Sequence, residues 1–240
     1  MLDTAALWAG ERVLDVACGT GLVSFRAVDM VGKTGVVVGT DISGEMVEAA
    51  RRLAAERGIR NARFERFDAE GMNLDEEPFD AALCGLGMMY VPNPVKALEE
   101  MRRLLKPGRR AVAAVWGARA KCGWAEISPI TDARVASEVC PMFFHLGTQD
   151  MLAQCYSNAG FTDVTSQRLD VELVYACEDD ALGAAFRGGP VALAYDCFDN
   201  ATRQAVHTEY LDSFAEYRVG DGYRIPGEFV VAAGVNPLSR

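Results

Sequence analysis

The first half of the chain alternates short apolar runs with longer segments whose apolar residues recur at helical spacing. The apolar runs predict strands at residues 12–17, 36–41, 62–67, 79–84 and 110–116. Between them, residues 22–31 and 46–57 carry one-sided apolar stripes, and a further helix is expected at 94–105. Strands alternating with helices of about ten to fifteen residues are typical of βαβ units, so this half predicts a parallel sheet covered by helices.

The pattern loosens beyond Gly117. Residues 118–147 have no clean period. The rest predicts a helix at 148–159, a strand at about 162–175, helices near 179–187 and 200–217, and a last strand at 228–233. About fifty residues therefore separate the last two strands, and they contain six spaced aromatic side chains: Phe186, Tyr195, Phe198, Tyr210, Phe214 and Tyr217. We expect this insertion either to pack on the sheet edge and mediate a dimer, or to cap a small apolar ligand.

A glycine-rich turn follows the first strand, with the pattern Asp15-x-x-Cys18-Gly19-Thr20-Gly21. A strand that enters such a turn before a helix presents unpaired backbone N–H groups to a ligand. Asp41 ends the second strand, twenty residues after Gly21, where a carboxylate can accept both hydroxyls of a ribose. By itself, Asp41 is equally suited to cap the helix that starts near Ser43. Turn and acid together favour a cofactor that contains a nucleoside.

Two residues bear on which cofactor this is. The dinucleotide fingerprint needs a third glycine three residues after the second, and that position is Ser24. Asp15 lies on the strand itself, four residues before the first glycine. A carboxylate there repels a pyrophosphate and attracts a cationic amine, which disfavours a nicotinamide cofactor.

Five motifs then appear in order: VLDVACGTG at 13–21, GTDISGEMVEAAR at 39–51, RFDAEGMNL at 66–74, FDAALCGLGMMYVPNP at 79–94 and LLKPGRRAVAAVWG at 104–117. Over residues 12–117 the chain resembles the class I S-adenosylmethionine-dependent methyltransferases, and more narrowly their ubiquinone/menaquinone-biosynthesis-like small-molecule branch. The resemblance implies a Rossmann-like, doubly wound, mostly parallel sheet of seven strands, with an antiparallel last strand and a helical insertion between the last two. It implies one methyltransferase domain over 1–240, with a cofactor-binding half (1–117) and a substrate-side half (118–240) that carries insertions at about 118–147 and 176–226.

The resemblance also implies which residues contact S-adenosylmethionine. Asp15 would orient its amine through water; Cys18, Gly19, Thr20 and Gly21 would cradle its methionine part; Asp41 would hold the ribose; Ile42 and Met46 would pack on the adenine; Asp68 and Ala69 would bind adenine nitrogens; Cys84 and Gly85 would line the sulfonium side. From the residues alone, Met46 on its apolar stripe is better suited to the core than to a ligand contact, Cys84 is equally suited to either, and Asp68 also suits a turn. Family members usually carry some tens of residues before the first strand, whereas about eleven precede Arg12. We therefore expect either a native chain that begins further upstream or a cofactor side that is left open.

Methyl transfer needs alignment more than a covalent residue, and a base is required only where the acceptor must lose a proton. The candidates are His145, in the irregular aromatic segment, and Tyr90, just past the fourth strand. His207 lies in a polar helical stretch and is expected on a solvated face. No carboxylate set typical of a magnesium site is present, so no metal is predicted.

Composition narrows the partners. The formal charge is −10, and the arginine pairs at 51–52, 102–103 and 109–110 are isolated, which disfavours nucleic acid and anionic membranes. Seven cysteines without C-x-x-C, and no run of about twenty apolar residues, predict a reduced cytoplasmic protein. The resemblance implies a small-molecule acceptor at O, C or N, and the insertion between the last two strands suggests a possible homodimer. The alternatives are a non-catalytic S-adenosylmethionine-binding partner or sensor, a nicotinamide-dependent oxidoreductase and, remotely, a metalloid methyltransferase using Cys140 and Cys155.

Overall fold

The computed structural model describes residues 1–135, 143–187 and 191–238. Its strands are β1 (Arg12–Val16), β2 (Val36–Asp41), β3 (Ala62–Arg66), β4 (Phe79–Gly85), β5 (Leu105–Trp116), β6 (Thr162–Tyr175), β7 (Arg218–Val219) and β8 (Gly222–Val235). Its α-helices are α1 (Leu2–Ala5), α2 (Leu22–Val31), α3 (Gly44–Glu56), α4 (Pro94–Leu104), α5 (Ile127–Asp132), α7 (Met151–Asn158), α8 (Glu178–Phe186), α9 (Ala192–Asp196) and α10 (Asn200–Ser213). Short 3-10 turns are η1 (Met88–Tyr90), η2 (Arg119–Lys121) and η3 (Ala215–Tyr217).

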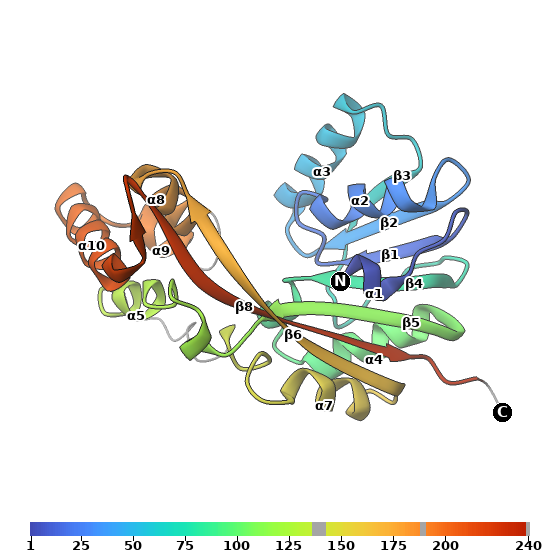
Figure 1. Ribbon diagram of the computed structural model, residues 1–240. Helices are drawn as coiled ribbons and strands as arrows, with labels where there is room; N and C mark the ends of the chain where they lie inside the picture. The colour runs from blue at the N-terminus through green and yellow to red at the C-terminus, as the bar shows by residue number, and fades with distance from the viewer. Residues whose placement is uncertain (136–142, 188–190, 239–240) are drawn as a thin grey trace. The chain divides into compact units, whose positions relative to one another are not determined.

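The strands form one sheet in the order β3-β2-β1-β4-β5-β8-β6, and the two-residue β7 pairs with β8 (Figure 1). The first five of these strands pair in parallel, so that Asp15 of β1 lies between Gly39 of β2 and Leu83 of β4. The strands near the C-terminus are antiparallel. This order and these directions confirm the predicted Rossmann-like fold class.

Strand β5 begins five residues earlier than the pattern predicts, because the turn residues Pro107 and Gly108 lie inside the strand. Phe79 pairs with Leu105, but Ala81 pairs with Arg110, so the intervening segment of β5 bulges out of register. Pro107 and Gly108 lie in this bulge, and Gly108 has φ +76°. A bulge accommodates a proline, which cannot donate to a ladder, and a glycine with positive φ.

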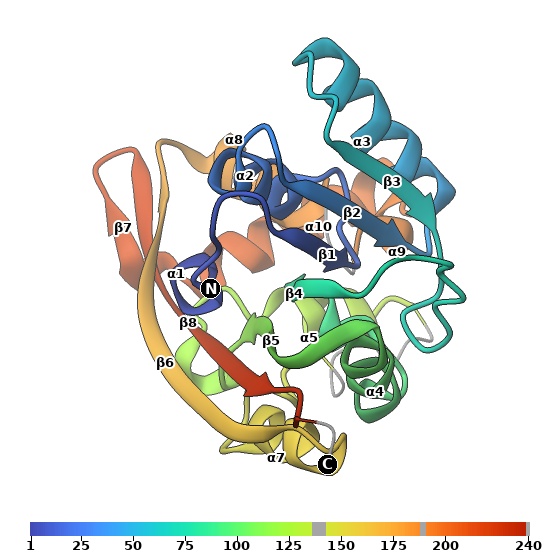
Figure 2. The same ribbon diagram turned by 90° about the vertical axis from the view of Figure 1, so that its right-hand side faces the viewer.

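The chain divides into two compact units. The first contains residues 1–115, 150–167 and 230–240, and the second contains 116–149 and 168–229. In the first unit, Val13, Leu83 and Val112 pack with α1 and α2 on one face of the sheet. Their strand neighbours point to the other face, where α4 and α7 contact each other. Figure 2 shows α1 and α2 on one side of β1, β4 and β5, and α4 on the other.

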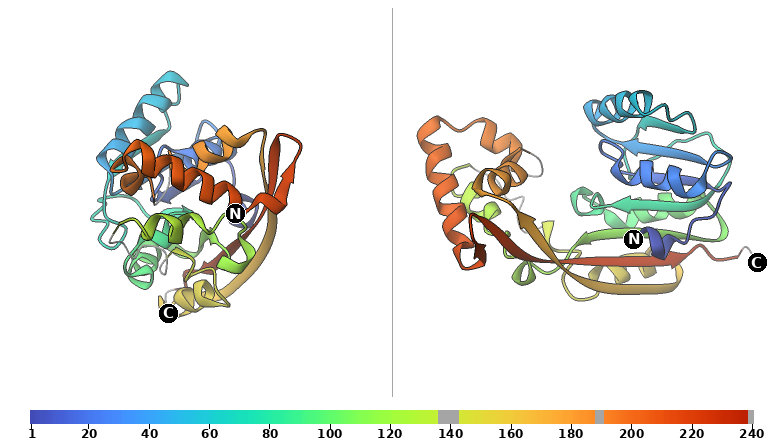
Figure 3. Two further views of the ribbon diagram at one scale, coloured as in Figure 1. Left: turned by 90° about the vertical axis from the view of Figure 1, so that its left-hand side faces the viewer. Right: turned by 45° about the horizontal axis from the view of Figure 1, so that its top comes forward.

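The second unit has its own apolar core. Phe186 of α8, Val206 of α10, Phe214 and Ile225 of β8 are all at least 98% buried and belong to one cluster. Helices α8, α9 and α10, drawn in orange tones in Figure 3, build most of this unit together with α5. The helical insertion between β6 and β8 therefore shares one apolar core with α5 and β8. Within the described ranges no helix is long and apolar enough to cross a membrane.

Candidate functional site

A pocket of about 370 Å³ opens in the first unit where four parallel strands end. Its lining is Ala17, Gly19, Asp41, Ile42, Phe67, Asp68, Ala69, Leu86, Gly87, Tyr90, Val91 and Pro92. Each of these residues ends β1, β2, β3 or β4 or lies in the segment that follows one of them. In open α/β sheets, ligands bind outside the carboxyl ends of the strands, so this pocket is the candidate site.

The carboxylate of Asp41 joins the glycine-rich turn to the end of β2. Its Oδ2 accepts the Gly19 N–H at 2.8 Å, and its Oδ1 accepts the Ser43 N–H at 2.9 Å. An ionised carboxylate has about four acceptor positions, so both oxygens can accept further donors from a ligand. The cap of α3 itself falls to Ser43, whose hydroxyl accepts the Met46 N–H. Asp41 therefore holds the turn in place at the pocket wall.

Gly19 gives the pocket an open floor. Its φ is +54°, and a Cβ built there would meet no atom within 4 Å. Free space above a backbone without a side chain lets a ligand approach the chain closely. Gly21, the N-cap of α2, also has a left-handed φ of +92°, and its N–H donates to the Cys18 carbonyl. The turn thus has the shape expected of a cradle for a polar group.

Two pocket residues that are not glycine adopt left-handed backbone conformations. Ala17 has φ +53° and Leu86 has φ +60°. Gly87 explains how the two turns fit, since a Cβ on it would lie 2.4 Å from the Ala17 Cβ. Non-glycine residues in this region cost about 1–2 kcal/mol each, and such strain is often found at functional sites.

We expect Ala17→Gly to raise the free energy of unfolding by about 1 kcal/mol or less, because glycine adopts this φ without strain but loses more chain entropy. Urea unfolding of both proteins measures the difference. Gly19→Ala is the control, since a new side chain at φ +54° should destabilise the protein. An Ala17→Gly protein less stable than the parent by 1 kcal/mol or more would contradict the assignment of strain.

Asp15 of β1 is completely buried and is not part of the pocket lining. Its Oδ2 accepts the Ser24 hydroxyl at 2.5 Å, and its Oδ1 has no hydrogen-bond partner. Burial raises the pKa of this carboxyl to about 7, although the hydrogen bonds from Ser24 oppose the change. Ser24, which departs from the dinucleotide fingerprint, thus serves as the partner of Asp15.

The cysteine side chains next to the pocket belong to the core. Cys18 packs with Phe25 and Phe64, and burial raises the pKa of its thiol above the usual value. Cys84 is fully buried, and burial raises its pKa to about 12. The pocket is lined instead by Leu86 and Gly87, the residues that follow Gly85. Neither thiol is available as a nucleophile at neutral pH.

The residues expected at an adenine ring are placed differently from one another. Ile42 is 63% exposed and lines the pocket together with Asp68 and Ala69. Asp68 also closes a turn, since its Oδ1 accepts the Glu70 N–H at 2.9 Å. Met46 is 38% exposed, so it lies outside the core, and it is not among the pocket residues.

The two candidate bases lie in different units. Tyr90 of η1 is half-exposed, lines the pocket and has a pKa raised by burial. His145 lies in an exposed turn of the second unit. The expectation for His207 is wrong: it is partly buried, its Nε2 lies 2.8 Å from the Tyr195 hydroxyl and its ring stacks on Tyr195. The polar sequence around His207 gave no sign of this contact, because its aromatic partner Tyr195 lies on another helix, α9.

Sequence reasoning missed half of the lining. Ala17, Phe67, Leu86, Gly87, Val91 and Pro92 were not singled out, although Ala17 and Phe67 end predicted strands and the other four follow one. The rule that sites form at the carboxyl ends of parallel strands would have found them. No group of three metal-ligating side chains occurs among the described residues. Cys140 lies outside those residues, so its pairing with Cys155 stays untested.

Comparison with known proteins identifies the first half of the chain. A family model described as a methyltransferase domain matches residues 7–140. Aklanonic acid methyltransferase DauC of Streptomyces sp. (strain C5) is 37% identical over 110 residues, 46% of this chain and 50% of the relative. The ubiquinone/menaquinone biosynthesis C-methyltransferase UbiE of Coxiella burnetii is 40% identical over 103 residues, 42% of this chain and 41% of the relative. The chain thus spans about half the length of the curated relatives it matches.

Solved structures resemble the whole chain in fold. A Bacillus halodurans protein described as a methyltransferase is 21% identical and has a TM-score of 0.66, with 98% of this chain and 96% of that chain covered. Phosphoethanolamine N-methyltransferase 2 of Haemonchus contortus, solved with S-adenosyl-L-methionine, is 16% identical with a TM-score of 0.64, covering 98% and 51%. These likenesses extend the fold beyond the matched first half.

Proposed function

This chain belongs to the methyltransferase-domain family, and from that premise we propose that it transfers a methyl group from S-adenosylmethionine to a small-molecule acceptor at O, C or N. The observation that carries the proposal is the carboxylate of Asp41 at the pocket wall, bonded to the Gly19 N–H at 2.8 Å. An acid at the end of the second strand beside a glycine cradle suits a ribose. The relatives named for small-molecule methylation, DauC and UbiE, support the acceptor class.

The residues of the pocket fit this cofactor. Asp41 would accept the ribose hydroxyls while keeping its bonds to the turn. Gly19 leaves room for the methionine part. Asp15 is fully buried and outside the lining, so its unpaired Oδ1 would orient the amine only through water. Ile42 would cover the adenine ring on the open side of the pocket, with Asp68 and the Ala69 N–H at its nitrogens. Cys18, Thr20 and Gly21 would contribute backbone to the cradle, and the backbone of Cys84 and Gly85 would line the sulfonium side, next to Leu86 and Gly87.

S-adenosylmethionine supplies an electrophilic methyl group on a cationic sulfur. The chain has to hold this group in line with the acceptor and to exclude water, since positive charge disperses as the bond to the methyl group forms. The apolar lining of Leu86, Val91 and Pro92 suits this task. Burial raises the pKa of Tyr90, so its phenol stays protonated at neutral pH and donates a hydrogen bond to an acceptor oxygen rather than removing a proton.

His145 stays the candidate general base where the acceptor must lose a proton. A His145→Ala variant should then lose turnover and keep its affinity for the cofactor. Equal turnover in both proteins would remove His145 from the mechanism.

Met46, exposed and outside the lining, is the one residue of the implied adenine contacts whose substitution by alanine should leave cofactor affinity within about twofold of the parent.

We further propose that the chain is one methyltransferase domain, with the cofactor held by residues 1–117 and acceptor specificity residing in 118–240. The absence of the five motifs from the later part supports this division. The charge and the cysteine pattern support a cytoplasmic enzyme without a nucleic-acid partner. A homodimer formed through the helical insertion is a separate proposal. Light scattering of the purified protein would decide the oligomeric state.

Titration calorimetry tests the proposed function. Micromolar binding of S-adenosylmethionine and S-adenosylhomocysteine is expected, with no heat from NADH as the control. A labelled methyl donor and a panel of phenols, quinols and acidic-carbon acceptors then tests turnover. Binding of NADH alone would contradict the proposal, and binding of the sulfur cofactors without turnover on any acceptor would favour a sensor.

A further inference from the structure

The segment between β3 and β4 carries one wall of the pocket and has no helix or strand of its own. We call residues 67–78 the β3–β4 strap. Asp68 and Ala69, near its start, line the pocket. A segment without regular structure depends on side-chain contacts to hold its course, so the strap's anchors determine where this wall lies.

The middle of the strap is fixed to α4. Met72 is fully buried, its N–H donates to Glu100 Oε2 at 3.0 Å, and its carbonyl accepts Arg103 Nη2 at 2.6 Å. Glu100 and Arg103 also pair with each other one turn apart on the helix. Both backbone groups of one buried residue are therefore satisfied by a single ion pair, which holds the strap firmly at this point.

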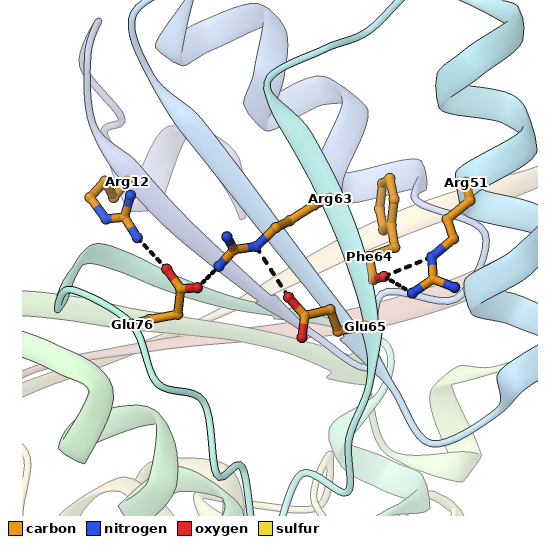
Figure 4. A network of polar contacts seen from close by, with 6 residues as sticks. All are labelled: Arg12, Arg51, Arg63, Phe64, Glu65 and Glu76. Atoms are coloured by element: carbon orange, nitrogen blue, oxygen red, sulfur yellow. Dashed lines mark hydrogen bonds and ion pairs between the residues drawn. The ribbon is translucent and has the colours of Figure 1, made fainter.

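The end of the strap is fixed to the sheet. Glu76 accepts Arg12 Nη2 at 2.7 Å through Oε2 and Arg63 through Oε1. Figure 4 shows Glu76 between these two arginines, with Arg63 also reaching Glu65. The Glu76 side chain is only 16% exposed, so this contact is better protected from water than an ordinary surface pair.

The start of the strap, next to the pocket, has one long-range side-chain anchor among the described contacts. Glu70 Oε1 accepts the N–H of Asn93 at 2.8 Å. Asn93 follows Pro92 of the opposite pocket wall and is also the N-cap of α4, where its Oδ1 accepts the Lys96 N–H. The bond therefore joins two walls of the pocket: Asp68 and Ala69 precede Glu70, and Tyr90 to Pro92 precede Asn93.

We propose that Glu70 is a positioning residue for the adenine end of the cofactor, because it fixes the separation of these two walls. Glu70 does not line the pocket, so it acts through Ala69 and Pro92 and not by touching the ligand. The inference rests on the proposed function of the pocket. Loss of the bond leaves the start of the strap with the backbone bond from the Phe67 N–H to the Asp41 carbonyl and with its local turn contacts, from Asp68 to Glu70 and Gly71. Residues 68–71 then lose their one side-chain tie to the other wall among the described contacts, and the cofactor must order them as it binds.

The test compares four variants by calorimetry with S-adenosylhomocysteine and with adenosine, the part of the cofactor without its methionine end. Glu70→Ala should weaken the binding of both ligands by the same factor, about three- to tenfold, which is the range expected for the loss of one partly exposed hydrogen bond. Glu70→Gln keeps an acceptor oxygen and should restore parental affinity. Glu70→Asp withdraws the oxygen by one methylene group and should behave like Glu70→Ala. Glu77→Ala removes the same charge from an exposed position of the same strap and should match the parent.

Steady-state kinetics adds a readout that general destabilisation would not produce: KM for S-adenosylmethionine should rise in Glu70→Ala while kcat stays unchanged. Glu70→Ala and Glu70→Asp proteins that bind both ligands as the parent does would overturn the inference. A parent protein that binds neither ligand would instead refute the proposed function. If Glu70→Ala fails to fold, Glu70→Asp against Glu70→Gln decides the question alone.

Discussion

Replacing Asp15 with asparagine should remove a loss of stability that the parent protein suffers as the pH rises from about 4 to about 7. The carboxyl is completely buried, and burial raises its pKa from 3.8 to about 7. In the unfolded chain it ionises near pH 4. Above that pH, ionisation lowers the free energy of the unfolded state, while the folded state keeps the carboxyl protonated and is not stabilised in the same way. A tenfold change in proton affinity is worth about 1.4 kcal/mol, so the effect of this one group approaches about 4 kcal/mol.

The sign follows from the direction of the pKa change. A carboxyl whose pKa is raised by folding contributes its stability fully below pH 4, and this contribution is lost as the pH passes through about 7. Urea unfolding of the parent and Asp15→Asn at pH 4.5 and pH 8 measures it, and the variant should gain on the parent by several kcal/mol over that interval. The difference between the two proteins cancels all other titrating groups.

Asp80 offers a control of opposite sign on the next strand. Burial raises the pKa of Asp80, but three neighbours lower it by more, so the net change is downward. They are the backbone N–H of Arg12, Lys106 through its hydrogen bond at 2.8 Å and its charge, and the charge of Arg109. Its contribution to stability is present above the pKa of the unfolded chain and is lost on acidification. Asp80→Asn should therefore lose stability relative to the parent as the pH rises. An Asp15→Asn protein with the same pH dependence as the parent would show that Asp15 ionises freely inside the fold.

Asp41→Ala should weaken the binding of S-adenosylhomocysteine by about 5- to 150-fold. This factor corresponds to about 1–3 kcal/mol, the cost of leaving polar groups unpaired. Two losses combine in this change. The ribose hydroxyls lose their acceptor, and the Gly19 and Ser43 N–H groups lose theirs, so the glycine turn is less well ordered before the ligand arrives.

Two further variants separate these losses. Asp41→Asn keeps one acceptor oxygen for the backbone and should recover part of the affinity. Glu45→Ala removes an exposed carboxylate from the first turn of α3 and should bind as the parent does, which controls for net charge. Calorimetry gives the affinities and thermal unfolding gives the stability of each variant. Parental affinity in Asp41→Ala would show that the ribose lies elsewhere.

The sequence was sufficient for β1 to β4 and for β6, because the spacing of apolar residues reports which positions are buried. It was also sufficient for the ends of β1 and β2, where Gly19 and Asp41 lie within hydrogen-bond distance across 22 residues of sequence. It was insufficient for β5, whose bulge at Pro107 and Gly108 has the same turn signal as a loop. Turn residues mark a departure from regular pairing, and they do not say whether the strand resumes its register on both sides.

The rest of the site depends on contacts between elements far apart in the chain. The Glu70–Asn93 bond spans 23 residues, and the pairing of Met72 with Glu100 spans 28. No local sequence pattern marks Glu70 or Glu100 as a long-range partner, since a glutamate in a polar segment is normally expected on the solvated surface. Met46 shows the converse: it lies on the apolar stripe of α3, yet it is 38% exposed. Helical periodicity gives the direction of a side chain but not what, if anything, covers it.

A crystal structure of the protein grown with S-adenosylhomocysteine is the most direct test of the account. The pocket at the ends of β1 to β4 should hold the ligand, with its ribose hydroxyls on Asp41, its adenine beside Ile42 and the Asp68–Ala69 wall, and its methionine part over Gly19. The Glu70–Asn93 bond should be retained. Density for the ligand anywhere other than this pocket, or a ribose that does not contact Asp41, would contradict the assignment of the cofactor site.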